Sequence, residues 1–263
     1  KFKVGQHIAA DPNIFCEKCD QCKANVQNFC EDMHAVGVTR HGAFAQYLTV
    51  PERCVFDITG MTFTEGALVE PLACVVYGQE KAGVPLGGSV LIMGAGPIGL
   101  MHLQLAKMNG AAEVIVVDMF EHKLELAKKL GADKVYLADK FEKTEQINKY
   151  ELVIDCTGVP KVVESSIKYV KDSGTMLFFG VCPDNSTITI NPYEIFKREL
   201  KLIGSFALKK TYGKALKLAR SGKINLSALV DKKLTLEDLP EYFNNLSSVN
   251  RGFKAVVYPN DII

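Results

Sequence analysis

The sequence predicts an α/β protein in which a doubly wound parallel sheet lies between segments of irregular β structure. Two observations support this fold class. From about residue 71 to residue 205, short and continuously apolar runs alternate with amphipathic segments of helical period, which is typical of a parallel sheet covered by helices on both faces. Residues 1–70 instead show apolar alternation on either side of a cysteine-rich loop, with no helical period before Thr64.

The individual elements follow from the apolar period and from residues that end helices, such as Gly110 and Gly131. We expect strands at Lys3–Ala10, Ala43–Val50, Ser89–Met93, Glu113–Asp118, Lys134–Leu137, Leu152–Cys156, Thr175–Val181 and Gly252–Tyr258. Helices are expected at Ile98–Asn109, Glu121–Leu130, Lys161–Val170, Lys210–Ser221 and Leu236–Asn245. In the last of these helices, Leu236, Leu239 and Phe243 have the spacing of a buried face.

The composition is that of an ordinary globular protein. The chain has 263 residues, 48% hydrophobic and 23% charged, and a formal net charge of +1. Because no basic run occurs, neither nucleic acid nor a membrane surface is expected as a partner. No apolar stretch reaches the ~18–20 residues of a membrane span. The N-terminus has no signal peptide and no initiator Met, so we expect a cytoplasmic protein whose first printed residue lies inside a longer chain.

A glycine-rich segment directly follows the strand that ends at Met93 and opens the next helix. In this context the first glycine permits a tight turn, the second lets the backbone approach a pyrophosphate, and the third lets helix and strand pack closely. The free N–H groups of the helix N-terminus then face the phosphates. The predicted dinucleotide-binding residues are Gly94, Gly96, Pro97, Ile98 and Gly99.

An acidic residue closes the following strand, about 20 residues after the glycines, where such sites hold the adenosine ribose. This residue is Asp118, and no arginine adjoins it. A carboxylate accepts hydrogen bonds from ribose hydroxyls and repels a 2′-phosphate, so NAD is favoured over NADP. Lys123 either reaches the same ribose or is a solvated helix lysine.

Four of the eight cysteines fall in one short loop, as Cys16, Cys19, Cys22 and Cys30. Four thiolates can close a tetrahedral shell around Zn²⁺ with no open position, which is typical of a structural site. Disulfides or a redox or iron–sulfur role are the alternatives, although cysteines two residues apart are poor partners for one another. The other four cysteines, Cys54, Cys74, Cys156 and Cys182, are interpreted as small buried hydrophobic residues.

The order of these segments resembles the zinc-containing medium-chain dehydrogenases, and most of all their polyol dehydrogenases. The resemblance rests on the four-cysteine loop, Gly42–Tyr47, Glu70–Leu72, Gly94–Gly99 and Asp118. It implies an α/β Rossmann domain, residues 73–205, inserted in a GroES-like catalytic β domain made of residues 1–72 and 206–263. It also implies a homodimer or homotetramer, with the segment Leu200–Phe206 and a strand around Thr187–Ile190 near the contact.

The resemblance further implies a catalytic zinc bound by a cysteine, a histidine and a carboxylate or water. Of these ligands the sequence offers Glu70 alone, and the segments that carry the cysteine and histidine do not occur in it. From the residues alone, Glu70 is a helix-start acid, since Pro71 suits a first helical turn. Tyr77 occupies a position where many relatives have histidine, which puts a proton relay there in doubt.

The expected function is zinc-dependent transfer of hydride from a secondary alcohol to NAD, the alcohol being a polyol such as sorbitol or arabinitol. The zinc would act as a Lewis acid on the alcohol oxygen. The alternative is a non-catalytic NAD- and zinc-binding protein that lacks the catalytic zinc. Because Glu70 cannot hold zinc alone, we expect the 263 residues by themselves to be inactive.

Overall fold

The structure is a computed structural model that describes residues 1–144, 147–245 and 252–260. Backbone contacts divide the chain into two compact units, Lys1–Cys74 with Ala207–Ile263 (unit 1) and Val75–Phe206 (unit 2). These units are defined by contacts alone, and the domain boundaries expected after residues 72 and 205 remain predictions. In the part of the chain that the structure describes, no helix has both the length and the apolar character needed to cross a membrane.

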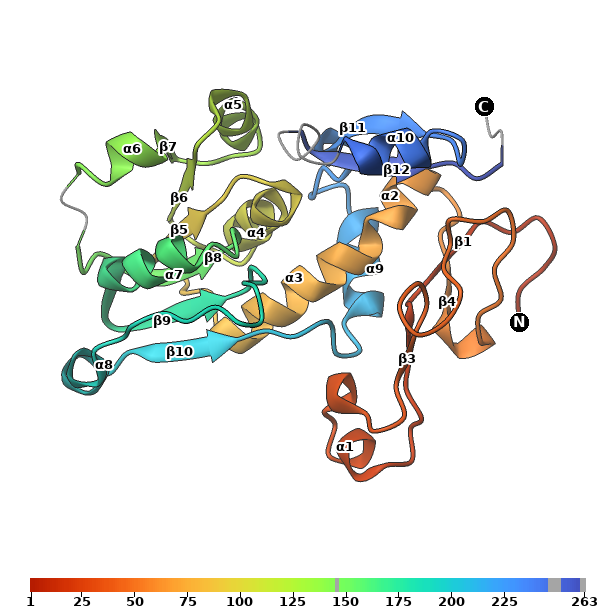
Figure 1. Cartoon of the computed structure of the whole chain (residues 1–263), viewed down its shortest axis with the longest axis horizontal. Coiled ribbons are helices and arrows are strands. Elements are labelled where there is room, and N and C mark those ends of the chain that lie inside the picture. Colours follow the sequence, from red (N-terminus) through yellow and green to blue (C-terminus); the bar gives the residue numbers. More distant parts are fainter. Residues whose placement is uncertain (145–146, 246–251, 261–263) are drawn as a thin grey trace. The chain divides into compact units, whose positions relative to one another are not determined.

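Unit 2 is built on a six-stranded sheet in which every neighbouring pair is parallel (Figure 1). The strand order is β10-β9-β8-β5-β6-β7. The strands are β5 Ser89–Met93, β6 Glu113–Asp118, β7 Lys134–Leu137, β8 Tyr150–Asp155, β9 Val170–Phe178 and β10 Lys201–Gly204. The parallel sheet and the strands that the apolar runs predicted at its centre are therefore confirmed.

The strand order reverses between β5 and β8. From β5 the chain adds β6 and β7 on one side through α4 (Pro97–Met108) and α5 (Glu121–Lys129). It then returns and adds β9 and β10 on the other side of β8 through α7 (Pro160–Ser166) and α8 (Pro192–Arg198). Connections between parallel strands are right-handed. Because the chain moves in opposite directions along the sheet in its two halves, α4 and α5 cover one face and α7 and α8 cover the other. The carboxyl ends of β5 and β8 flank the reversal, which is where such sheets bind ligands.

The core of unit 2 consists of the central strands, as continuous apolar runs predict. Val90, Leu91 and Ile92 of β5 are completely buried. The helices α4 and α5 end where the sequence predicts, because Gly110 and Gly131 adopt φ angles of 93° and 101°, and a residue with a side chain is strained there. The remaining short elements of unit 2 are α6 Ala138–Phe141 and the 3₁₀ turn Ile167–Tyr169.

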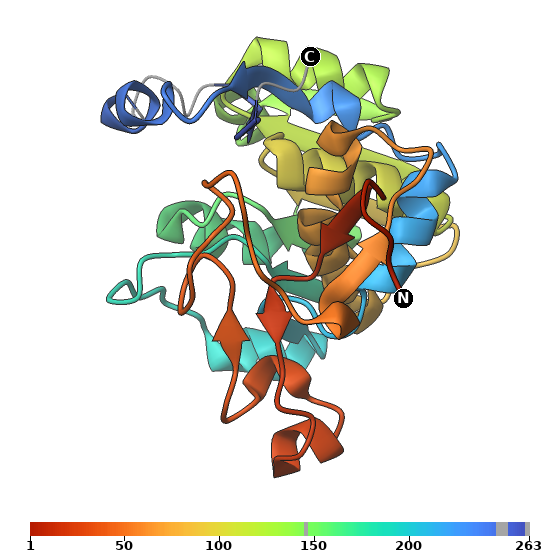
Figure 2. The ribbon, with the colours of Figure 1, turned by 90° about the vertical axis from the view of Figure 1, so that its right-hand side faces the viewer.

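Unit 1 consists of short strand pairs and helices joined by irregular backbone, coloured red to orange and blue in Figures 1 and 2. The pairs are antiparallel β1 Ile8–Ala10 with β4 Val55–Asp57, antiparallel β2 Asn13–Ile14 with β3 His34–Ala35, and parallel β11 Val230–Leu234 with β12 Lys254–Val257. The helices are α1 Asp20–Lys23, α2 Phe63–Ala67, α9 Tyr212–Arg220 and α10 Leu239–Asn244, and α3 Val69–Ala82 continues into unit 2. Three 3₁₀ turns lie at Gln27–Phe29, Glu52–Cys54 and Ser227–Leu229.

Two strands predicted in residues 1–70 are wrong or too long. Residues 43–50 form no strand, and Phe44 and Tyr47 are 60% and 90% exposed. Apolar alternation yields a strand only when another strand supplies hydrogen bonds, and no described strand pairs with this segment. The strand predicted at Lys3–Ala10 is confined to Ile8–Ala10, the three residues that pair with β4.

Three further expectations need correction. The strand predicted around Thr187–Ile190 is absent, because those residues have no ladder partner. The strand predicted at Thr175–Val181 ends at Phe178, its last pair with β10. The helix predicted at Leu236–Asn245 begins only at Leu239, since Thr235 and Asp238 form a turn in which the Thr235 amide donates to the Asp238 carboxylate, and Phe243 is exposed rather than buried.

Candidate functional site

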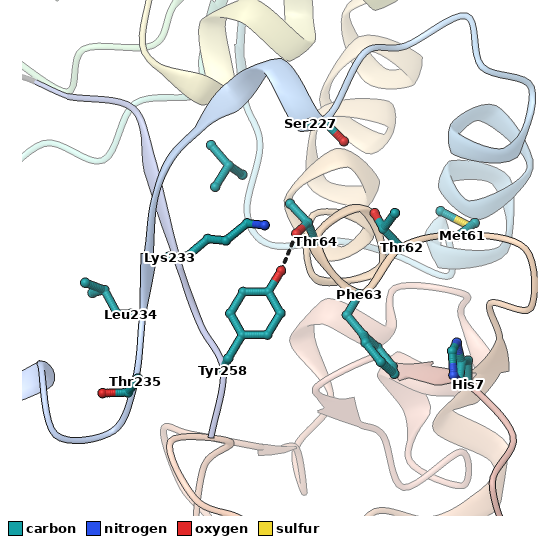
Figure 3. A pocket seen from close by; sticks show the side chains of 11 residues that line it. His7, Met61, Thr62, Phe63, Thr64, Ser227, Lys233, Leu234, Thr235 and Tyr258 are labelled. Carbon is teal, nitrogen blue, oxygen red and sulfur yellow. Dashed lines mark hydrogen bonds between the residues drawn. The ribbon is translucent and has the colours of Figure 1, made fainter. Parts of the chain in front are cut away.

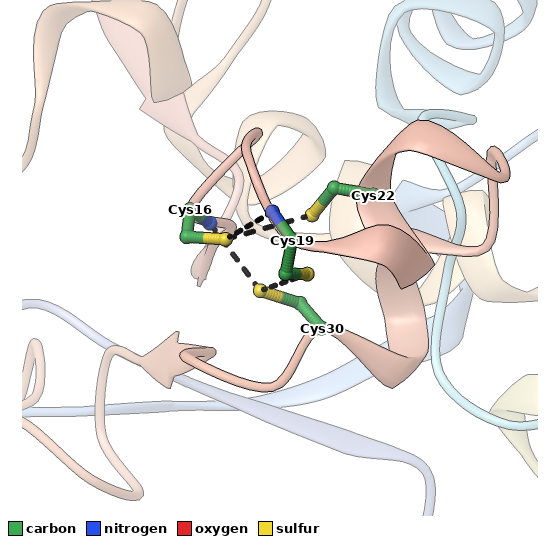
Figure 4. A group of neighbouring side chains, drawn as sticks. All are labelled: Cys16, Cys19, Cys22 and Cys30. Atoms are coloured by element: carbon green, nitrogen blue, oxygen red, sulfur yellow. Dashed lines mark hydrogen bonds between the residues drawn. The ribbon is translucent and has the colours of Figure 1, made fainter.

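The four-cysteine loop brings all four predicted zinc ligands together. Cys16 follows β2, Cys19 precedes α1, Cys22 lies on α1, and Cys30 follows a 3₁₀ turn. Glu17 and Asn25 adopt left-handed backbone, with φ of 62° and 59°, which folds this short segment back on itself. Figure 4 shows the four side chains pointing toward one another.

The spacing of the sulfurs suits a metal and excludes disulfides in this structure. All four Sγ atoms lie within 4.8 Å of one another, with 4.0 Å between Cys16 and Cys22 and 3.9 Å between Cys19 and Cys30. Four sulfurs at ~2.3 Å from a tetrahedral zinc lie about 3.8 Å apart, whereas a disulfide needs ~2.05 Å. Within the described ranges, this is the one group of three or more His, Cys, Asp or Glu side chains placed to hold a metal.

Backbone N–H groups around the sulfurs favour thiolates. The amide of Cys19 donates to Cys16 Sγ and the amide of Cys16 donates to Cys30 Sγ, both at 3.3 Å. Hydrogen bonds from the backbone of Lys18 and Cys19 lower the pKa of Cys16 to about 6. Burial, with the neighbouring thiols of Cys19 and Cys30, raises the pKa of Cys22 to about 12. A divalent cation would offset the mutual repulsion of four thiolates, so the donor set fits zinc.

The glycine loop has the geometry that its sequence predicts. Gly94 follows β5 with φ of 102°, and Pro97 occupies the first turn of α4, next to Ile98. A Cβ at Gly99 would lie 1.9 Å from the carbonyl oxygen of Gly94, so no other residue fits there. A Cβ at Gly96 would meet nothing within 4 Å. Gly99 is therefore required by packing, whereas Gly96 leaves open space at the N-terminus of α4.

Asp118 is held against the glycine loop. It ends β6, next to β5 in the sheet. Its Oδ2 accepts from the amide of Ala95 at 2.7 Å, and its Oδ1 accepts from the amide of Phe120 at 3.0 Å. A carboxylate offers about four lone-pair sites, so both oxygens keep capacity for the hydroxyls of a ribose.

Lys123 is not a solvated helix lysine, because it is only 7% exposed. It lies in the first turn of α5, and its ammonium lies 5.2 Å from the centre of the Phe120 ring. The sequence could not show this burial, which depends on how the backbone after Asp118 folds over α5.

Glu70 lies in the first turn of α3 and is partly buried. Its Oε1 accepts from the thiol of Cys74 at 3.4 Å. Burial raises the pKa of Glu70, and the nearby carboxylate of Asp11 adds to this effect. Glu70 also lines a cavity of about 230 Å³ together with Ile8 and Tyr212. Glu70 is therefore a helix-start acid that also faces a cavity, and its role as a zinc ligand stays a prediction.

A larger hollow of about 850 Å³ in unit 1 contains none of the predicted site residues (Figure 3). Its lining is rich in hydroxyl groups, and the Thr64 and Tyr258 hydroxyls are hydrogen-bonded at 2.5 Å. Lys233 and His7 also line the hollow, but no carboxylate or thiol does. The hollow therefore does not have the lining of a metal site.

Two family sequence patterns match this chain. That of the zinc-binding dehydrogenases matches residues 97–221, and that of the alcohol dehydrogenase GroES-like domain matches residues 1–60. D-altritol 5-dehydrogenase of Agrobacterium fabrum is 36% identical over 251 residues, which cover 94% of this chain and 74% of that protein. The chain belongs to the zinc-binding alcohol dehydrogenase family. Its fold is therefore a Rossmann domain inserted in a GroES-like β domain.

Other members of the zinc-binding alcohol dehydrogenase family support this assignment. D-arabinitol dehydrogenase 1 of Uromyces fabae is 34% identical, over 98% of this chain and 76% of that protein. A zinc-binding dehydrogenase from Sinorhizobium meliloti 1021, solved with NADP bound, superposes with a TM-score of 0.93 at 32% identity, covering 98% of this chain and 78% of that one. The chain thus spans about three quarters of the length of these relatives.

Within this family fold, sequence reasoning missed two buried carboxyl groups and one contact of a partly buried thiol. Asp11 and Asp155 are 7% and 0% exposed, and the Cys74 thiol contacts Glu70. The signal for Asp155 was present, as an acid that ends a strand before Thr157 and Gly158. Of the cysteines interpreted as buried, Cys54 is 6% exposed, whereas Cys74, Cys156 and Cys182 are only partly buried. His102 is completely buried, and its ring lies nearly perpendicular to that of Phe179, with 4.5 Å between the ring centroids.

Proposed function

We propose that this chain carries the NAD-binding site and the structural zinc site of a dehydrogenase that oxidises a secondary alcohol of a polyol to a ketone. The observation that supports it most is the combination of a four-thiol cluster with a glycine loop whose partner acid is in place. The names of the relatives, which act on altritol and arabinitol, support a polyol as the substrate class.

The proposed zinc stoichiometry is one per chain, held by Cys16, Cys19, Cys22 and Cys30. A shell of four thiolates leaves no position for substrate, so this zinc would stabilise the loop and take no part in the reaction. The backbone N–H groups that donate to the Cys16 and Cys30 sulfurs would orient those ligands.

The proposed cofactor is NAD. The free N–H groups at the N-terminus of α4 would bind the pyrophosphate, and the open space above Gly96 would admit it. Asp118 would accept hydrogen bonds from the adenosine ribose and repel a 2′-phosphate. NADP is the second candidate, favoured by the S. meliloti relative that binds it and by the buried ammonium of Lys123 near this strand end. When bound, the nicotinamide accepts or donates the hydride.

A catalytic zinc does not fit the residues described around Glu70. Such a site needs about three protein ligands and one open position, and the described residues place no such group around this carboxylate. Glu70 would serve as one ligand at most. The alternative function is a protein that binds NAD and zinc without catalysis.

Cofactor choice is tested by calorimetric titration of NAD and NADP. We expect tighter binding of NAD, and we expect Asp118→Ser to reduce the preference about tenfold by removing both the ribose acceptor and the repulsion. Asp139→Ser removes another exposed carboxylate of unit 2 and should change neither affinity. Tighter binding of NADP than of NAD to the unaltered chain would contradict the proposal. Assays of the complete reading frame's product with NAD and a panel of pentitols and hexitols separate the enzyme from its non-catalytic alternative.

A further inference from the structure

A buried carboxylate lies at the carboxyl end of β8, beside the reversal of strand order. Asp155 is completely buried and forms no ion pair in the described part of the chain. Its Oδ1 accepts from the amide and the hydroxyl of Thr157, at 3.1 and 2.6 Å, and its Oδ2 accepts from the amide of Gly158 at 3.1 Å. A buried carboxylate is costly unless it is fully hydrogen-bonded. The donors to Asp155 all lie in one turn, residues 156–158, so these hydrogen bonds fix the conformation of that turn.

This turn contacts the glycine loop on one side. The amide of Cys156 donates to the carbonyl of Met93 at 2.8 Å, at the end of β5. A Cβ placed on Gly94 would lie 3.2 Å from Cγ2 of Thr157 and 3.4 Å from the carbonyl carbon of Cys156. A shift of the turn would therefore move the start of the glycine loop.

On the other side the turn contacts the chain after β9. A Cβ on Gly158 would lie 2.4 Å from the carbonyl oxygen of Val181, and a Cβ on Gly180 would lie 2.5 Å from Oδ2 of Asp155. The turn is thus enclosed between the ends of two neighbouring strands and has little freedom to move except with them.

The hydrogen bonds of Asp155 also decide what this turn can bind. The amides of Cys156, Thr157 and Gly158 are all donated within the protein, so toward a ligand the turn backbone offers carbonyl oxygens. The first turn of α4, by contrast, has amide groups without helical acceptors. One side of the reversal of strand order therefore suits an anion, and the other suits hydroxyl or amide donors.

We propose that Asp155 is a positioning residue for the nicotinamide riboside half of the cofactor, an inference that rests on the proposed NAD-binding function. β6, which ends in Asp118, and β8, which ends in Asp155, lie on opposite sides of β5 and its glycine loop. A dinucleotide whose adenosine ribose binds Asp118 extends across this reversal of strand order, so its second half lies on the β8 side. Asp155 does not touch the cofactor; it fixes the turn that does.

The test compares NADH with AMP, which contains only the adenosine half. Asp155→Asn keeps the volume but turns an NH₂ group toward a backbone N–H donor, and Thr157→Val removes one donor without changing shape. We expect the Kd of NADH, measured by its fluorescence, to rise about tenfold in Asp155→Asn and about threefold in Thr157→Val. The Kd of AMP, measured by calorimetry, should stay within about twofold. Thr157→Ser keeps the hydroxyl and should restore NADH binding, and Asp139→Asn is the matched control.

The outcomes separate this inference from the proposed function. If the unaltered chain binds neither NADH nor AMP, the NAD-binding function is wrong. If it binds both and the two variants bind NADH normally, the role of Asp155 is wrong. An equal loss of NADH and AMP affinity in both variants would show a merely structural role and also overturn it. Thr157 is exposed, so Thr157→Val decides the matter if Asp155→Asn does not fold.

Discussion

The four-cysteine loop of unit 1 and the six-stranded sheet of unit 2 depend on different sources of stability. The buried apolar residues of the loop are Phe15, Cys22 and Cys30, and the strands beside it are two residues long. The sheet instead has three central strands whose side chains are almost entirely buried. Burial of apolar surface can account for the sheet, whereas the loop has too little of it. A metal ion is the remaining source of folding energy for the loop.

The largest effect is expected from breaking the zinc site. Cys19→Ser should reduce bound zinc from one per chain to none and unfold the loop, since structural zinc contributes on the order of 10 kcal/mol in small metal-dependent folds. Elemental analysis measures the metal, and proteolysis reports on the loop. NADH binding by unit 2 should persist. Cys182→Ser is the matched control and should retain zinc; a zinc that survives Cys19→Ser would refute the four-ligand assignment.

A smaller effect is expected from a cavity in the sheet. Leu91 is completely buried in β5, so Leu91→Ala should lower the free energy of unfolding of unit 2 by about 2–5 kcal/mol. Urea titration followed by circular dichroism measures it. Leu86, at 88% exposed, provides the control, and Leu86→Ala should change stability by less than about 0.5 kcal/mol. Zinc content should not change in either variant, and a loss of zinc in Leu91→Ala would show that the loop depends on the sheet.

The smallest effect is expected at Glu151, at the start of β8. Burial alone would raise its pKa, but hydrogen bonds from Lys171 and Ser89 outweigh it and lower the pKa to about 2. The carboxylate therefore stabilises the fold above the unfolded pKa of 4.5, and this contribution is lost as the pH falls toward 2. Glu151→Gln should cost about 1 kcal/mol at pH 7, because solvent partly screens the pair. Urea titrations should show the difference vanish near pH 2, and Glu125→Gln, an exposed change, should show none.

The geometry of the glycine loop and of Asp118 could be predicted because its signals are local. The turn at Gly94, the close approach at Gly99 and the acid at the end of the next strand each depend on a few consecutive residues. The convergence of the four thiols could be predicted for the same reason, since the four cysteines lie within one short segment.

The errors of prediction concern features that depend on distant residues. The alternation at 43–50 is that of a strand, but alternation does not supply a hydrogen-bonding partner. Phe243 has helical spacing, yet its side chain is 47% exposed and its ring lies 6.1 Å from that of Phe44, which is exposed itself. The burial of Lys123 and the turn around Asp155 result from packing between strand ends that are far apart in sequence, and no short pattern reports such packing.

Gly96 and Gly99 have opposite tolerances to mutation. An alanine at Gly99 would collide with the backbone of Gly94, so the Gly99→Ala chain should fail to fold. An alanine at Gly96 projects into open space, so the polypeptide can accumulate normally while the methyl group blocks the approach of a pyrophosphate. On the proposed NAD-binding function, both alanine variants would lose the cofactor in a genetic screen, but only the Gly96 allele would still yield a folded chain.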